Sequence, residues 1–592
     1  MKEDEKFQNQ YYDNNELSSR FVTSNISIEF DYEYYEQQPL RLNAGEEIKN
    51  ENRKPPPPKN EDAVVTTIGD FGKWQMRLSI MMALLRFPIC WYQLDIIFLA
   101  PTTEFWCKKP EAFSEYSDDK WRQMSVPLIE ENPCLIFDPE ILRTYPTLSR
   151  SLIPFVKCES FEYNLSVFTK TLITDWDLVC DRQWMVNFTQ VVLMCGFLLG
   201  SIIFGKMADK YGRKTPLMIS IVIQTLMSYA ASFMPSYWMF LVCRFILALA
   251  SGGIGIISFV LVIEVVGGKW RTIIPVLYQL PFGLGNSVMS GLAYWLRDWR
   301  KLQFALSTLS ALFILYWFCI SESPRWLLAT GNTEEAYDVL EKAARINKRE
   351  FNKSKVKAML ENVKGRPEGV PSFMDFLKLK NMRMRTVMLA ITWFFTGLGF
   401  YVLAQYLGWI GNNIFLSVML SGLISSIGPI TCVFVIMKMG RKTTLAIFEG
   451  LTALCFIFII LIPRDVFTSD WPRLVFAGIG FGGMAGTVPL LYLFSGELYP
   501  TLGRNVGVSG VSTFARVGSM VAPVVVSLNE LHPDLPLYVM AVALFAQILV
   551  LIPLPETKDR PLPDTLEEAE QLGQKQKVHI STSTTPILPK QK

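Results

Sequence analysis

Long apolar segments separated by short polar loops dominate the chain from about residue 77 to residue 555. Each segment is long enough to cross a bilayer as an α-helix, which takes about 20 residues. The pattern predicts an all-α membrane protein with about twelve transmembrane helices, six in each half of the chain. The predicted helices cover residues 77–100, 185–206, 215–234, 237–260, 272–296, 302–321, 386–408, 414–438, 443–463, 472–496, 501–528 and 535–555.

Short polar signatures of the first half return in the second half at nearly the same spacing. The sequence GKMADKYGRK at 205–214 is matched by MGRK at 439–442. The other matched positions are Glu264 with Glu497, Arg271 with Arg504, and Glu322 with Glu556. A hydrophobic chain with such a repeat is expected to form two pseudo-symmetric six-helix halves, and two packed membrane halves usually indicate alternating-access transport.

Domain boundaries follow from the same pattern. Residues 1–75 are polar and include the proline run Pro55–Pro58, so they predict a disordered cytosolic tail that cannot bury a core. The remaining predicted parts are an N-terminal six-helix bundle at 76–321, with an outer loop at 101–184, a central cytosolic loop at 322–385, a C-terminal six-helix bundle at 386–556 and a cytosolic tail at 557–592.

The placement of lysine and arginine predicts which side of the membrane each loop faces. Basic residues concentrate at 206–214, at 438–442 and in the central loop, and a twelve-helix chain brings all three to one side. We therefore expect a multi-pass plasma-membrane protein with both termini in the cytosol. The loop at 101–184 then lies outside the cell.

Four cysteines lie in this outer loop, whereas the other six lie in apolar segments. Four cysteines in one polar extracellular stretch predict two disulfides, and three pairings are possible. The four are Cys107, Cys134, Cys158 and Cys180. The same loop contains the sequon Asn164-Leu165-Ser166, which predicts N-glycosylation of Asn164.

Composition narrows the classes of function. The chain of 592 residues is 50% hydrophobic, and its formal net charge of +3 is too small to indicate a nucleic-acid partner. Its two histidines, His532 and His579, have no partner at metal-ligand spacing, and no nucleotide loop of the form G-x-x-x-x-G-K-[ST] occurs. We expect no metal, no cofactor and no enzymatic activity. Membrane lipid is an expected partner, and the energy for transport is expected to come from substrate gradients or from an unidentified coupled ion.

The duplicated charges predict a gate on the cytosolic side. Asp209 and Arg213 are expected to pair with charges and helix ends of the other half when that side is closed, so that loss of these pairs favours inward opening. The alternative is that the basic residues only set the topology. The predicted gate residues are Asp209, Arg213, Glu264, Arg271, Glu322, Arg325, Arg441, Glu497, Arg504 and Glu556.

These motifs resemble a known family. GKMADKYGRK is similar to the loop signature of the major facilitator superfamily, and ESPRWL and PETK are similar to marks of its sugar porters and its organic-ion transporters, solute carrier family 22. The second group is favoured by the long outer loop with four cysteines and by further motifs: GDFGKWQ at 69–75, FLAPTTE at 98–104, GELYPT at 496–501 and RNVG at 504–507. The resemblance covers about residues 66–570 and implies the superfamily fold and transport of small organic ions.

Ionisable residues inside membrane segments are costly and are therefore candidates for substrate binding. Arg516 lies at a position that, by the resemblance, is acidic in cation carriers and basic in organic-anion and carnitine-type carriers, so it predicts binding of a substrate carboxylate. Arg86 and Asp95 match no family pattern. Arg86 is expected to add positive potential or to pair with an acid, and Asp95 either faces water or attracts a cationic group. Arg244 is expected to be structural.

Aromatic residues on the predicted cavity-side helices could stack on organic ions or hold a quaternary ammonium group. The candidates are Tyr278, Phe400, Tyr401 and Tyr492, each with packing as the alternative. The segment at 424–431 lacks a lysine that some anion carriers of the family place there, which leaves room for zwitterions such as carnitine. The alternative hypotheses are an organic cation transporter, a sugar porter and a non-transporting sensor or scaffold.

Overall fold

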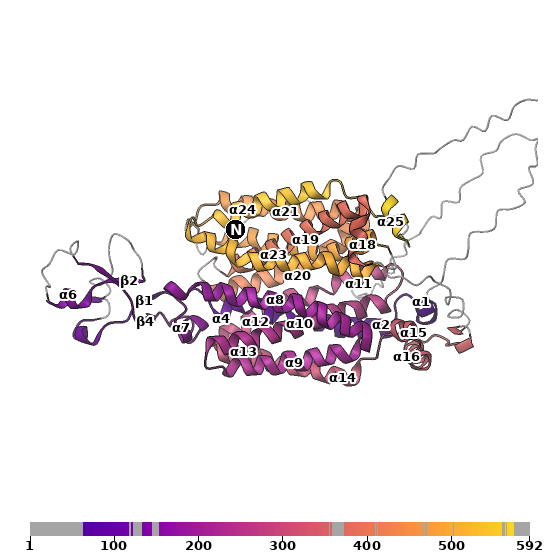
Figure 1. Cartoon of the computed structure of the whole chain (residues 1–592), viewed down its shortest axis with the longest axis horizontal. Coiled ribbons are helices and arrows are strands. Elements are labelled where there is room, and N and C mark those ends of the chain that lie inside the picture. Colours follow the sequence, from indigo (N-terminus) through magenta and orange to yellow (C-terminus); the bar gives the residue numbers. More distant parts are fainter. Residues whose placement is uncertain are drawn as a thin grey trace, which may run out of the picture. The chain divides into compact units, whose positions relative to one another are not determined.

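The computed structural model describes residues 63–572, with gaps at 118–119, 122–132, 145–152, 355, 358–371, 409, 411–412, 465, 468–469, 501–502, 559–562 and 564. Most of the predicted N-terminal tail, and the C-terminal tail after residue 572, lie outside the described residues. The described part is a bundle of long helices (Figure 1), which confirms the predicted all-α membrane fold.

The N-terminal half supplies six membrane segments, three of them built from consecutive helical pieces. The first segment is α2 (Lys73–Leu84), α3 (Arg86–Leu94) and α4 (Ile96–Leu99). Three continuous helices follow: α8 (Trp184–Tyr211), α9 (Lys214–Phe233) and α10 (Tyr237–Val265). The fifth segment is α11 (Trp270–Leu277) and α12 (Leu280–Leu296), and the sixth is α13 (Trp299–Ala311), η4 (Leu312–Leu315) and α14 (Tyr316–Cys319).

The C-terminal half supplies six helices without such interruptions. They are α19 (Lys380–Leu407), α20 (Ile414–Lys438), α21 (Arg441–Leu461), α22 (Trp471–Leu498), α23 (Arg504–Ser527) and α24 (Leu535–Leu551). Within the described residues, nine helices are long and apolar enough to cross a membrane. The first and fifth segments are not among the nine because their helices are interrupted, and α24 is not among them because it has only 17 residues. Pro275 and Pro281 flank the interruption of the fifth segment, where proline removes a backbone donor.

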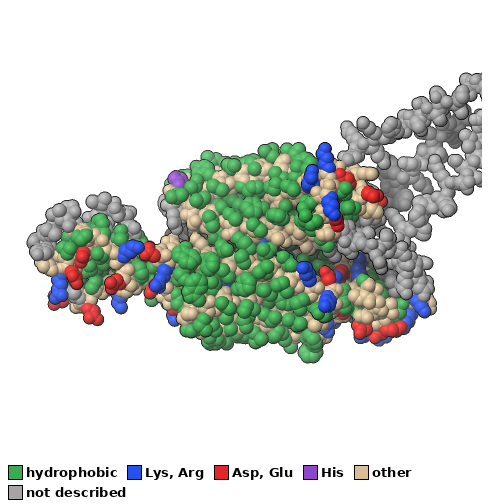
Figure 2. Space-filling model, viewed as in Figure 1, with side chains coloured by type: hydrophobic (Ala, Val, Ile, Leu, Met, Phe, Trp, Pro, Cys, Tyr) green, Lys and Arg blue, Asp and Glu red, His purple; other side chains and the backbone are tan. Residues whose placement is uncertain are grey.

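The two halves pack against each other mainly through α12 with α20 and α8 with α23, and α11 adds contacts with α20 and α22. Glycine makes the contact of α12 with α20 possible, because a Cβ on Gly283 would lie only 2.7 Å from the carbonyl oxygen of Gly422. Figure 2 shows hydrophobic side chains covering the flank of the bundle. Large hydrophobic side chains that are exposed on the membrane helices include Val242, Phe434 and Val542. An apolar exterior of this extent suits a lipid environment.

The polar loop between α4 and α8 folds into a small lobe with two antiparallel strand pairs. Strand β1 (Phe105–Cys107) pairs with β4 (Phe161–Tyr163), and β2 (Leu135–Phe137) pairs with β3 (Phe155–Lys157). The lobe also contains η1 (Glu111–Phe113), α6 (Pro139–Thr144), α7 (Leu172–Trp176) and η3 (Cys180–Arg182). It is tied to the bundle by Asp175, which accepts hydrogen bonds from the Trp299 indole and the Arg300 guanidinium at 3.0 and 3.1 Å.

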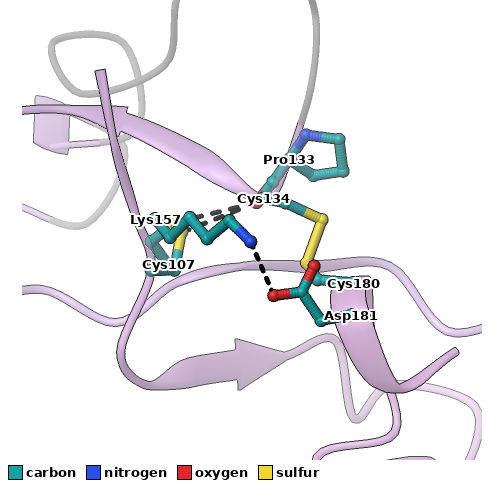
Figure 3. Close-up of a disulfide and its surroundings, with 7 residues drawn as sticks. Cys107, Pro133, Cys134, Lys157, Cys180 and Asp181 are labelled. Atoms are coloured by element: carbon teal, nitrogen blue, oxygen red, sulfur yellow. Dashed lines mark hydrogen bonds and ion pairs between the residues drawn. A yellow bond between two sulfur atoms is a disulfide. The ribbon is translucent and has the colours of Figure 1, made fainter. Parts of the chain in front are cut away.

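Two disulfides hold this lobe together, and the structure selects one of the three possible pairings. Cys107 bonds to Cys158, and Cys134 bonds to Cys180. The second bridge is drawn in Figure 3, beside the 2.8 Å ion pair between Lys157 and Asp181. Cys107 is the last residue of β1, and Cys158 lies between β3 and β4, directly after β3. The pairing of β1 with β4 brings the two cysteines close together.

Short helices lie at the end of the bundle opposite this lobe (Figure 1). They are α1 (Ala63–Ile68), α15 (Pro324–Ala329), α16 (Thr333–Ile346), α18 (Phe373–Lys378) and α25 (Leu566–Gln571). The sequence-based boundary of the tail at residue 75 is wrong, because residues 63–75 are structured. Helix α1 packs on α16, and the Asn347 side chain accepts from the Trp74 backbone N–H at 2.9 Å and donates to Gln75 at 2.7 Å.

Candidate functional site

A central cavity of about 130 Å³ lies between the two halves. Its walls come from α3, α8, α10 and α12 of the first half and from α19, α22 and α23 of the second. Five of the seven predicted substrate-binding residues line it: Arg86, Phe400, Tyr401, Tyr492 and Arg516. The fold therefore brings together residues that are up to 430 positions apart in the chain.

We call the end of the bundle that carries the duplicated GRK sequences, at 212–214 and 440–442, the GRK end. A second cavity of about 530 Å³ continues from the first toward this end. Ser201, Ile256 and Tyr492 line both cavities, so the two spaces adjoin. Charged residues of the predicted gate surround the second cavity: Asp209, Arg213, Arg271, Glu497 and Arg504.

The opposite end of the bundle, which carries the disulfide-bonded lobe, is held closed by contacts between the halves. The rings of Phe98 and Phe415 stack with centroids 5.8 Å apart, and the Ser290 hydroxyl donates to the Phe415 carbonyl oxygen. The Ser287 hydroxyl donates to the carbonyl of Met419 at 2.8 Å. The central space thus connects to the GRK end and is closed toward the lobe.

Arg516 projects from α23 into the wall of the central cavity. Within the described part of the chain it has no ion pair, and the cavity wall contains no aspartate or glutamate. It lies close enough to Tyr401 to interact with it electrostatically. Helices α19 and α23 approach closely at this level, because a Cβ on Gly397 would lie 2.1 Å from the carbonyl oxygen of Ala515.

Arg86 supplies a second cationic group from the beginning of α3. Its guanidinium carbon lies 4.5 Å from the ring centroid of Tyr278, whose hydroxyl shares a hydrogen bond with Ser258. The Arg86 Nε is buried and has no hydrogen-bond partner among the described residues. Tyr278 does not line the cavity but is buried against Arg86. It therefore stabilises the Arg86 cation through its ring and does not contact the cavity itself.

Aromatic rings form much of the remaining wall. Phe400 packs edge-on against Tyr401 at 5.5 Å and against Phe282 at 5.7 Å, and Tyr492 packs against Trp393 at 4.5 Å. Phe282, Trp393 and Phe259 also line the cavity and were not predicted to do so. An aromatic residue within an apolar run carries no sequence signal that separates the cavity face from the packing face.

Asp95 does not line the cavity, contrary to the predicted substrate-binding role. Its carboxylate binds the guanidinium of Arg244 in α10, with oxygen–nitrogen distances of 2.6 and 3.1 Å. The exposed fractions of these side chains are 0% and 1%. A charge in the membrane interior needs a partner, and here each residue neutralises the other, which agrees with the structural role expected for Arg244.

In the N-terminal half, four of the predicted gate residues form one network: Asp209, Arg213, Glu264 and Glu322. The Arg213 guanidinium contacts Glu264 at 2.8 Å and Asp209 at 2.9 Å. Burial alone would lower the pKa of Arg213, but its hydrogen bond to Glu264 and these two negative charges raise the pKa above its ordinary value. The Glu322 carboxylate accepts from the backbone N–H groups of Arg213 and Lys214, at 2.7 and 3.0 Å, and so caps α9.

The C-terminal half repeats this network. Arg441 contacts Glu497 at 3.1 Å, and the Glu556 carboxylate accepts from the backbone N–H groups of Arg441 and Lys442, at 2.7 and 3.1 Å. The pairs are therefore within each half, in a state whose GRK end is open. The pairing across the halves that the sequence predicts for a closed GRK end stays a prediction. Arg325, at the second position of α15, lines neither of these two cavities.

The glycosylation candidate Asn164 follows β4 in the lobe. Its side-chain nitrogen donates to Glu104 at 3.1 Å, and its oxygen accepts from the backbone N–H of Ser166 at 3.1 Å. Glycosylation of Asn164 stays a prediction.

Comparison with known proteins identifies the family. A family model described as "Sugar (and other) transporter" matches residues 157–569. The chain is 31% identical to the "Organic cation transporter protein" of Drosophila melanogaster, with 87% of this chain and 95% of the relative covered. It is also 31% identical to human "Solute carrier family 22 member 13", with coverage of 86% and 92%.

The chain belongs to solute carrier family 22. This family 22 carrier has the fold of the major facilitator superfamily, because the Escherichia coli xylose transporter XylE in a partially occluded, inward-open conformation matches it with a TM-score of 0.56. That match covers 83% of this chain and all of XylE at 14% identity. The fold and family make the chain a multi-pass membrane transporter, as its motifs predict.

Proposed function

We propose that this carrier moves small organic anions or zwitterions, such as carnitine, across the plasma membrane by alternating access. The observation that carries the proposal is the pair of arginines, Arg86 and Arg516, in a cavity wall whose described residues include no aspartate or glutamate. A guanidinium in a low-dielectric site is stabilised strongly by a carboxylate, which it can bind with two parallel hydrogen bonds. A substrate carboxylate would supply the charge that the wall lacks.

The aromatic part of the wall supports a zwitterion in particular. Phe400, Tyr401 and Tyr492 offer ring faces to a quaternary ammonium group, while Arg516 offers its guanidinium to the carboxylate of the same molecule. Relatives named organic cation transporters favour a cationic substrate as the second candidate. The missing acidic residue weighs against it, because a free cation would then enter a cavity with two positive charges.

The orientation of the carrier is also part of the proposal. Lysine and arginine gather at the GRK end and the disulfides lie at the other end, which supports a cytosolic GRK end and cytosolic termini. The described conformation would then be inward-open. Release of substrate toward the cytosol would pass the charged wall formed by Asp209, Arg271 and Arg504.

An uptake screen tests the proposal. Cells that express the full chain are incubated with labelled carnitine, a labelled dicarboxylate or a labelled organic cation, and uptake is normalised to the amount of carrier at the cell surface. We expect uptake of carnitine or the dicarboxylate above that of untransfected cells. Uptake of the cation alone would favour the second candidate.

Two further measurements test the remaining alternatives. Competition by glucose would indicate a sugar porter. A chain that lacks residues 1–60 but keeps its transport activity would contradict a sensor or scaffold role.

A further inference from the structure

A glutamate outside the substrate cavity has no counter-charge within the part of the chain that the structure describes. Glu449 lies on α21, eight residues after its first residue, which is about 12 Å along the helix axis from the GRK end. The side chain is fully buried, with an exposed fraction of 0%. Among the described residues it forms no ion pair, and its Oε2 atom has no hydrogen-bond partner.

One neutral side chain accounts for the contact that Glu449 does make. Gln547 of α24 donates from its amide nitrogen to Glu449 Oε1 at 2.5 Å and to the Thr396 hydroxyl of α19 at 2.9 Å. The same nitrogen lies 3.2 Å from the carbonyl oxygen of Thr392. The Gln547 Oε1 atom is also buried without a partner in the described part of the chain. Two buried, unpartnered oxygen atoms therefore belong to this pair of side chains.

The surrounding helices do not neutralise Glu449. Its own helix α21 carries Arg441, which pairs with Glu497 of α22, and α22 carries Arg473, which pairs with Asp534. The other ionisable side chains on α21 and on the helices packed around Glu449 form no hydrogen bond or ion pair with it within the described residues. These side chains are Lys380, Arg383, Arg385, Tyr401 and Tyr406 of α19, Cys432 and Lys438 of α20, Lys442 and Cys455 of α21, Tyr492 of α22 and Tyr538 of α24.

An isolated carboxylate in a membrane interior is unstable, so a positive ion must neutralise it. We propose that Glu449 is a proton-binding site that takes up and releases one proton in each transport cycle. A proton needs only one carboxylate oxygen, whereas a metal cation prefers several converging oxygen ligands. The described part of the chain shows no cluster of three or more acidic, histidine or cysteine side chains that could hold such an ion.

The site is connected to the substrate cavity through one residue. Thr396 accepts the hydrogen bond from Gln547 and also lines the central cavity, next to Gly397, which packs on the helix of Arg516. Protonation of Glu449 changes the hydrogen bonds that Gln547 makes. Because Gln547 donates to Thr396, the change also reaches the cavity wall beside the substrate. The chemistry is one protonation: an O–H bond forms on Glu449 from one aqueous side and breaks toward the other.

Infrared spectroscopy of the purified full chain in lipid nanodiscs tests the proton site without any substrate. We expect the carbonyl stretch of a protonated carboxyl group at neutral pH in the wild type, its loss in Glu449→Gln, and its retention in Glu140→Gln, which removes an exposed carboxylate of the lobe. The proposal is overturned if the wild type lacks the band, or if Glu449→Gln retains it. Loss of the band when sodium replaces choline in the buffer would assign the site to a metal cation instead.

The coupling of this proton to transport rests on the proposed function. Proteoliposomes with a clamped membrane potential receive an inward pH gradient of about one unit, with labelled carnitine and labelled succinate as probes. One proton per substrate molecule gives about tenfold accumulation in the wild type. Glu449→Gln, which cannot release a proton, is expected to lose this accumulation and to keep exchange of labelled for unlabelled probe.

The two hypotheses fail in different ways in this experiment. If the wild type moves a probe but ignores the pH gradient, or if Glu449→Gln accumulates the probe as the wild type does, proton coupling is overturned and the proposed function stands. If the wild type moves neither probe, the proposed substrate class is overturned, and the infrared band alone decides whether Glu449 holds a proton.

Discussion

Glu556 caps α21 in the C-terminal half just as Glu322 caps α9 in the N-terminal half. Each carboxylate accepts two backbone N–H groups at the start of its helix, with distances between 2.7 and 3.1 Å. A glycine makes room for each one, because a Cβ on Gly212 or Gly440 would lie 2.4 or 2.1 Å from a carboxylate oxygen. The repeated sequence signatures thus correspond to a repeated structural contact.

The capping contact leads to a prediction about stability. Replacing Glu322 or Glu556 by alanine leaves two helix N–H groups without their acceptor, and we expect a loss of about 1–2 kcal/mol for each. The measurement is the thermal unfolding temperature of the purified protein in detergent. Glutamine at the same position keeps one acceptor oxygen and is expected to cost less, so equal losses for the two substitutions would contradict a capping role.

Substrate binding by Arg516 leads to a second prediction. Arg516→Ala removes a charge-assisted contact worth about 1.5–3 kcal/mol, so the concentration for half-maximal carnitine uptake should rise roughly 10- to 150-fold. Arg516→Lys keeps the charge but loses the planar fork, and we expect an intermediate effect. Uptake is measured at several concentrations and normalised to surface expression. Arg143→Ala, which removes an exposed cation of the lobe, is the control.

Undiminished carboxylate uptake by a surface-expressed Arg516→Ala carrier would show that Arg516 does not hold the substrate. An equal fall for the Arg143→Ala control would assign the effect to the loss of any positive charge on the protein.

The buried pair of Asp95 and Arg244 allows a test that separates structure from transport. Arg244→Met or Asp95→Leu alone leaves one buried charge without a partner, and we expect a loss of about 3–5 kcal/mol. The double variant removes both charges and should recover much of that loss. Folded yield and unfolding temperature measure the effect. If the two single losses simply add in the double variant, the two side chains do not interact.

The disulfide pairing can be checked by mass spectrometry of peptides from the unreduced protein. We expect peptides that join Cys107 to Cys158 and Cys134 to Cys180. Loss of one bridge, by Cys134→Ser with Cys180→Ser, should destabilise the lobe by about 2–4 kcal/mol, because it releases a loop of the unfolded chain. Peptides that join Cys107 to Cys134 or to Cys180 would contradict the pairing seen in the structure.

The sequence alone determined the fold class, the two halves and the family. Membrane helices must satisfy their backbone groups internally, so length and hydropathy are sufficient to locate them, and the repeated charges at Arg213 and Arg441 reveal the duplication. Arg516 could be found because a charge in an apolar segment is rare. The interruption of the first and fifth segments was not predicted, because hydropathy does not respond to a local break in the helix.

Only the tertiary structure decided which ionisable residues meet. Arg86 and Asp95 looked alike in the sequence, yet Asp95 is neutralised by Arg244 while Arg86 lines the cavity against Tyr278. The sequence did not predict a role for Glu449. The tertiary structure shows that its neighbours, Gln547 and Thr396, are neutral. These partners lie on different helices, 98 or more residues apart. Their contact depends on helix rotation and packing, which a one-dimensional pattern of hydrophobic and polar positions does not encode.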